Sequence, residues 1–87
     1  MLTVTETASA RLGELLGKSP DGEVMRIVRL NRRARMRRDR VRPHDTTFSH
    51  KGRVVLVLDG SVATALAART LDVRQAPSGP RLRLRTR

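Results

Sequence analysis

Arginine dominates the side-chain chemistry that this sequence offers. The 87 residues include 19 lysines and arginines against 8 acidic residues, a formal net charge of +11. Residues 26–42 hold nine arginines against Asp39 alone, and residues 81–87 hold four more. Because a guanidinium is planar, it binds phosphates and carboxylates through two parallel hydrogen bonds. The candidate polyanion-binding residues are therefore Arg32, Arg33, Arg35, Arg37, Arg38, Arg40, Arg81, Arg83 and Arg85.

Positive charge this concentrated attracts polyanions, so nucleic acid or an acidic protein is the expected class of partner. Binding to RNA or DNA would be largely independent of base sequence, because contacts to phosphates do not read bases. An alternative interpretation is a solvated surface shaped by composition, since 17 of the 19 basic residues are arginine and charge runs often only solvate a chain. The sequence leaves these interpretations open.

Metal and catalytic chemistry have little support. His44, Asp45 and His50 are the only residues that resemble a metal-binding set, but their spacing matches no known motif. The serines and acidic residues form no recognisable triad, and no glycine-rich phosphate loop is present. The absence of cysteine excludes disulfides, thiolate nucleophiles and cysteine-held clusters. We therefore expect a protein that is not an enzyme and binds no cofactor.

Composition also limits the other classes of function. Phe48 is the only aromatic residue, which excludes an aromatic platform for stacking bases. The longest apolar run, Val54–Leu58, is far too short for a membrane span. The N-terminus lacks the basic and apolar regions of a signal peptide, so we expect a cytoplasmic protein. A chain of this length forms one small domain, residues 1–87, with a thin core.

The first element that must position these residues is an N-terminal helix. Thr5 is expected to cap its start and Gly17 its end, with Glu6 in the first turn. Apolar residues follow at the spacing of a helix packed on one side: Ala8, Leu12, Leu15 and Leu16.

Most of the remaining chain has the pattern of strands. Glu23–Leu30 is apolar on both faces, which indicates an interior strand. Residues 31–42 are predicted to form an irregular strand or mobile loop, because Ala34 and Met36 alternate with arginines until the alternation breaks at Arg37-Arg38. The other expected elements are a hairpin of Thr46–His50 and Arg53–Leu58, a short helix capped by Asp59 and carrying Val62, Ala65 and Leu66, a strand Thr70–Gln75, and a strand Arg81–Thr86 with Leu82 and Leu84 inward.

These elements predict a mainly β fold with two short helices, the N-terminal helix covering one sheet. Asp72 is expected at the end of its strand, with no catalytic role. Phe48, Met25 and Met36 are expected to fill the core.

Several short motifs resemble the HesB/IscA family, the A-type iron–sulfur carriers. The opening residues 2–8, followed by leucines at 12, 15 and 16, are similar to the start of these proteins. Further matches are Asp45 with Phe48, Gly52, the strand that ends at Asp59, Leu66, the run Leu71-Asp72-Val73, and Gly79. The resemblance implies a small mixed β-sandwich with the N-terminal helix packed on it.

The departures from this family bear on function. Its carriers hold iron or a cluster through three cysteines, one after the first strand and two in a C-terminal tail. The first position falls near residues 31–35, which offer only Asn, Arg and Ala, and the sequence ends at Arg87 without such a tail. The resemblance therefore implies a cysteine-free, non-catalytic relative with an accessory or protein-interaction role in iron–sulfur assembly. The alternative is a basic module that binds the backbone of RNA or DNA on the same fold.

Overall fold

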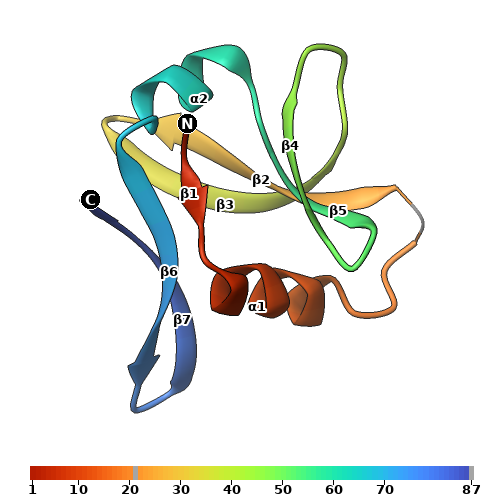
Figure 1. Ribbon diagram of the computed structural model, residues 1–87, viewed down its shortest axis with the longest axis vertical. Helices are drawn as coiled ribbons and strands as arrows, with labels where there is room; N and C mark the ends of the chain where they lie inside the picture. Colours follow the sequence, from red (N-terminus) through yellow and green to blue (C-terminus); the bar gives the residue numbers. More distant parts are fainter. Residues whose placement is uncertain (21, 87) are drawn as a thin grey trace.

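The computed structural model describes residues 1–20 and 22–86. Two mixed sheets enclose the core, one with the strand order β1-β6-β7 and the other β3-β2-β5-β4 (Figure 1). The mainly β fold with two helices is confirmed. In chain order the elements are β1 (Thr3–Val4), α1 (Glu6–Leu16), β2 (Glu23–Leu30), β3 (Arg33–Arg40), β4 (Thr46–His50), β5 (Arg53–Leu58), α2 (Gly60–Ala65), β6 (Arg69–Ala76) and β7 (Gly79–Thr86).

Helix α1 begins and ends as the sequence predicts. The Thr5 hydroxyl oxygen accepts a hydrogen bond from the Ala8 N–H at 3.1 Å, and Gly17 ends the helix at a positive φ of 49°. The Thr5 hydroxyl also donates to the carboxylate of Asp72 at 2.9 Å, which joins the start of α1 to β6. The prediction that Asp72 ends a strand is wrong, because Asp72 lies in the middle of β6 opposite Arg83.

The core lies between the sheets and under α1. It contains apolar residues from both helices and from strands of both sheets, and Phe48, Met36, Leu82 and Leu84 pack at its margin. In α2, Val62 and Leu66 are buried as expected, but Ala65 is exposed. The fully or nearly fully buried members are Leu2, Ala8, Leu12, Leu16, Met25, Ile27, Val55, Leu56, Leu58, Val62, Leu66 and Leu71.

The hairpin of β4 and β5 forms as predicted, with a register irregularity that adds to the core. Phe48 lies opposite Leu56 and Ser49 lies opposite Val54, so Val55 has no partner on β4. An unpaired residue of this kind turns a strand locally and re-aims its side chain. Val55 is buried in the core together with its neighbour Leu56.

Strand β3 corrects the prediction of an irregular strand or mobile loop. All eight of its residues pair in unbroken antiparallel register with β2, from Leu30 opposite Arg33 to Glu23 opposite Arg40. There is no bulge at Arg37-Arg38. Strand β2 stabilises this arginine-rich strand, because it supplies backbone partners along the whole of β3 and the carboxylate of Glu23 for Arg38.

The strand order of this sheet requires the connection between β3 and β4 to cross from one edge to the other. These two strands form its opposite edges, so residues 41–45 must pass across β2 and β5. The register places Arg26, Asp39 and Val57 on one face, opposite the core. The connection lies on that face, because Arg26 binds residues at both of its ends.

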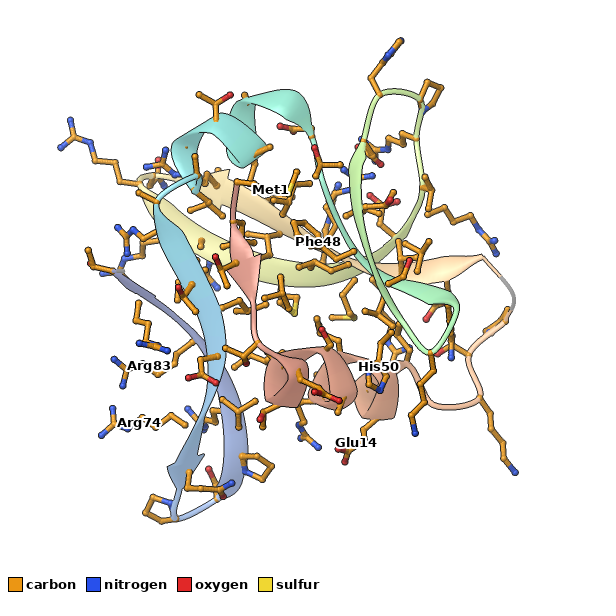
Figure 2. The ribbon with its side chains drawn as sticks, viewed as in Figure 1. Met1, Glu14, Phe48, His50, Arg74 and Arg83 are labelled. Carbon is orange, nitrogen blue, oxygen red and sulfur yellow. The ribbon has the colours of Figure 1, made fainter. Side chains whose placement is uncertain are left out.

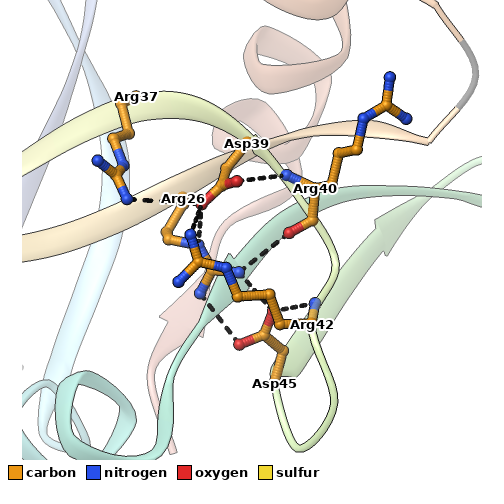
Figure 3. A network of polar contacts seen from close by, with 6 residues as sticks. All are labelled: Arg26, Arg37, Asp39, Arg40, Arg42 and Asp45. Atoms are coloured by element: carbon orange, nitrogen blue, oxygen red, sulfur yellow. Dashed lines mark hydrogen bonds and ion pairs between the residues drawn. The ribbon is translucent and has the colours of Figure 1, made fainter.

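The guanidinium of Arg26 fixes this connection (Figure 3). Its side chain is only 2% exposed, and it donates to Asp39 at 2.7 Å, to the two carboxylate oxygens of Asp45 at 3.0 and 2.5 Å, and to the carbonyl of Arg40 at 3.1 Å. The N–H of Arg42 donates to Asp45 as well. Hydrogen bonds to this many acceptors offset the desolvation penalty of the buried guanidinium, so it keeps its charge.

The polar contacts around Arg26 lower the pKa of both carboxylates, Asp45 and Asp39. The hydrogen bond from Arg26 is the main cause that lowers the pKa of Asp45, whose side chain is 3% exposed. The hydrogen bond from the Arg40 N–H, followed by that from Arg26, lowers the pKa of Asp39. A carboxylate with a lowered pKa in the folded state stabilises the fold above the ordinary carboxyl pKa and loses that contribution as the pH falls.

We expect Asp45→Asn to lower the free energy of unfolding at pH 7 by about 3 kcal/mol, because one partner of a buried ion pair is removed while Asp39 still accepts from Arg26. The wild-type value should then decline as the pH drops below about 4, the region in which an unfolded carboxyl takes up its proton. The variant should decline less, so that the two converge. Urea unfolding at pH 7, 5 and 3 measures both effects.

Glu14→Gln provides the control at pH 7. It removes a surface pair with Arg11 whose atoms are 3.6 Å apart and whose glutamate is 67% exposed. Such a change should alter the free energy of unfolding by no more than about 0.5 kcal/mol. Equal losses for Asp45→Asn and Glu14→Gln would contradict the role assigned to Arg26.

Candidate polyanion-binding surface

The arginines of β3 divide between its two faces. Arg33, Arg35 and Arg37 alternate along the strand and are exposed on the face opposite the core. Asp39 is the acidic residue on the same face of β3, where it lies 3.7 Å from Arg37 and 3.0 Å from Arg42. Asp39 also binds the buried Arg26, so its negative charge is shared among three arginines. Arg33 and Arg35, farther along the strand, remain exposed positive charges.

Arg38 is held by structural contacts. Its guanidinium donates to Glu23 at 2.6 Å, to the Ser19 hydroxyl at 2.5 Å and to the backbone carbonyl of Leu15 at 2.8 Å. The hydrogen bond from Arg38 lowers the pKa of Glu23. Arg38 therefore joins β3 to the end of α1, and its role in polyanion binding stays a prediction.

The backbone of Arg40 likewise serves the structure. Its N–H donates to Asp39 and its carbonyl accepts from Arg26. Arg32 lies away from Arg38 and Arg40, in the turn between β2 and β3.

The arginines of β7 form a row on the outer face of the hairpin β6–β7. Arg81, Arg83 and Arg85 are exposed, while Leu82 and Leu84 face the core, as predicted. Arg74 of β6, which the sequence analysis did not single out, lies directly opposite Arg81 and joins this row (Figure 2). Its signal was available, because the apolar Leu71 and Val73 take the inward face of the strand predicted over 70–75 and leave Arg74 on the outer face.

Asp72 is the acidic residue within this row, and it is shared. Hydrogen bonds from the Val73 N–H and the Thr5 hydroxyl lower its pKa, and Arg85 lies 3.4 Å from its second oxygen. Asp72 thus balances Arg85 and leaves Arg74, Arg81 and Arg83 with a net positive field. Directly opposed like charges such as Arg74 and Arg81 weaken a strand pair unless an anion lies between them.

The two basic segments meet at one groove. Strand β3 is the edge of one sheet and β7 is the edge of the other, and Arg35 and Arg83 both line a groove of about 300 Å³ between them. Its remaining lining is apolar and comes from both sheets: Ile27, Ala34, Met36, Leu71, Leu82 and Leu84. We call it the β3–β7 groove.

The three residues that resembled a metal set do not converge. His44 is exposed in the turn before β4, while His50 lies at the far end of that strand against α1, near Glu14 (Figure 2). The carboxylate of Asp45 is occupied by Arg26. Among residues 1–20 and 22–86, no three histidine, aspartate or glutamate side chains gather closely enough to hold a metal ion. None of the described helices is long and apolar enough to cross a membrane.

Sequence comparison finds no relative, whereas structural comparison does. No protein-family model and no curated protein matches the chain. Escherichia coli SufA, involved in biosynthesis of iron–sulfur clusters, superposes with a TM-score of 0.72 at 20% identity over 98% of this chain and 84% of SufA. IscA with its [2Fe-2S] cluster superposes with a TM-score of 0.62 at 18% identity over 99% of this chain and 82% of IscA.

The chain has the HesB/IscA-like fold. At these identities the likeness establishes the fold, and the expectation of a mixed β-sandwich with a packed N-terminal helix is confirmed. On the HesB/IscA-like fold of this chain, residues 31–35 form the β2–β3 turn and the start of β3. The sequence contains no cysteine at these or any other positions.

Proposed function

We propose that this protein is a non-catalytic binding domain that uses the fold of the iron–sulfur carriers without holding a cluster. In this proposal it serves an accessory role in iron–sulfur assembly and binds an acidic segment of a protein partner in the β3–β7 groove. The fold shared with SufA and IscA supports the cellular context. The groove supports the binding role.

The observation that carries the proposal is the lining of this groove. Arg35 comes from one basic segment and Arg83 from the other, 48 residues apart in the sequence. Each belongs to the outward face of its edge strand, so both lie at the rim of one apolar floor. Protein interfaces combine a desolvated apolar centre with a polar rim, and arginine is enriched in them. A partner segment that alternates acidic and aliphatic residues would match both parts of the groove.

The same lining fits nucleic acid less well. Apolar side chains such as Ile27, Met36 and Leu82 offer no hydrogen bonds to sugars or bases. Phe48, the single aromatic residue, packs against the core from β4 and lines no part of the groove. The row of Arg74, Arg81, Arg83 and Arg85 does favour a second candidate function, in which the outer face of β6–β7 follows a nucleic-acid backbone by charge.

The lack of cysteine supports the part of the proposal that no cluster is held. Iron–sulfur clusters in carriers of this family are held by cysteine thiolates, and the equivalent region here contains arginines, whose guanidinium has no free lone pair for a metal. After anaerobic reconstitution with iron and sulfide, we expect the protein to leave a gel-filtration column without stoichiometric iron or sulfide. Retention of both in equal proportion to protein would refute this part of the proposal.

We expect a fluorescein-labelled peptide of alternating glutamate and leucine to bind the protein, and the double variant Arg35→Gln/Arg83→Gln to weaken that binding about tenfold or more. The physical reason is the loss of two charge-assisted hydrogen bonds beside an apolar floor. Fluorescence anisotropy at low and near-physiological salt measures the affinity, because screening at about 0.15 M removes charge attraction that acts over more than about 8 Å.

The matched control is Lys18→Gln/Lys51→Gln, which removes the same charge at two exposed positions that do not line the groove. It should change the affinity less than about twofold at the higher salt. Equal weakening by both double variants would show that net charge alone is responsible. Tight binding of a labelled mixed-sequence RNA at the higher salt, with no peptide binding, would replace this proposal with the nucleic-acid candidate.

A further inference from the structure

Three arginines that the proposed function does not use line a second, smaller pocket. Arg29 lies near the end of β2, Arg32 lies in the β2–β3 turn, and Arg69 begins β6. The pocket has a volume of about 240 Å³, and Leu66 and Leu84 contribute apolar walls. Two parts of the chain, the β2–β3 hairpin and the start of β6, thus bring three positive charges to one concave site.

Among the residues that the structure describes, no aspartate or glutamate lines this arginine pocket. Within residues 1–20 and 22–86, the side chains of Arg29, Arg32 and Arg69 make no hydrogen bond or ion pair. This distinguishes them from Arg26, Arg38, Arg42 and Arg85, which all bind carboxylates. Like charges gathered in a concave site repel one another and raise the local attraction for an anion.

The backbone at Arg32 provides an independent observation. Leu30 pairs with Arg33, so the turn consists of Asn31 and Arg32, and both have positive φ, 52° and 65°. Two-residue turns of this kind favour Asn followed by Gly, because the second position is strained for a residue with a side chain. Asn31 fits that rule and Arg32 does not. A strained backbone residue that carries a charged side chain to a pocket motivates a hypothesis of function there.

We propose that the arginine pocket binds the phosphate group of a small molecule. A tetrahedral oxyanion offers several acceptors to guanidinium groups that approach from different sides. The volume is below that of most drug-sized ligand sites, so inorganic phosphate or pyrophosphate matches it better than a nucleotide does. The site goes beyond the proposed function, and it is distinct from the β3–β7 groove, with which it shares only Ala34 and Leu84.

Isothermal titration calorimetry with pyrophosphate, at constant ionic strength, tests this proposal on the full chain. We expect saturable binding with one site per chain, and Arg29→Gln and Arg69→Gln each to weaken it about tenfold, the loss expected for one charge-assisted contact. Lys18→Gln, which removes an exposed positive charge that lies outside the pocket, is the matched control and should leave the affinity unchanged. Circular dichroism verifies that each variant is folded.

Arg32→Gly separates binding from folding. Glycine relieves the positive φ and removes the guanidinium, so we expect a higher Tm together with about tenfold weaker pyrophosphate binding. Binding that does not saturate, or equal weakening by the pocket variants and Lys18→Gln, would overturn the proposal. So would RNA binding that depends on Arg29 and Arg69 without any pyrophosphate binding. Because no partner peptide is present, these outcomes are independent of the test of the groove.

Discussion

The buried guanidinium of Arg26 is the interaction on which the rest of this structure depends. The order β3-β2-β5-β4 requires a connection across the sheet, and Arg26 binds the residues at both ends of that connection. The connection lies over Val24 and Val57, which are buried although they lie outside the main core. By holding Asp39 as well, Arg26 fixes the end of β3 and, through β3, the edge that forms the β3–β7 groove. A buried positive charge at the centre of the sheet thereby fixes the connection and the edge strand, in a chain that contains far fewer acidic than basic residues.

The sequence predicts the elements whose signals are local. Thr5, Gly17 and the apolar stripe of α1 act within one or two helical turns, and the alternation in Arg81–Thr86 is complete within that strand. Prediction from the sequence fails at β3, because the partners that stabilise this strand are distant in the sequence. Arg38, for example, binds Leu15, Ser19 and Glu23. Arg26 itself carried a readable signal. It lies between Val24 and Val28 on one face of a strand predicted to be interior, which requires a buried arginine with carboxylate partners.

The candidate site was predictable in composition but not in geometry. Charge counting identifies nine arginines, and the structure separates them by role. Arg38 joins β3 to α1, Arg85 pairs with Asp72, and Arg35 and Arg83 line one apolar groove. Only the meeting of two edge strands from different sheets brings the basic segments together, and neither periodicity nor spacing reports which edges meet. In the proposed function the apolar floor matters as much as the charge, because a surface that only attracts polyanions needs no apolar floor.

The central claim is that β3 and β7 form one binding surface for an acidic protein segment. The most direct test is a set of amide ¹H–¹⁵N spectra of the ¹⁵N-labelled chain during titration with the glutamate–leucine peptide at near-physiological salt. If the peptide binds in the β3–β7 groove, chemical-shift changes concentrate on residues 34–36 and 82–84, with Ile27 and Leu71 beneath them. Changes spread evenly over all arginine-bearing strands, or confined to the outer face at Arg74 and Arg81, would contradict the claim.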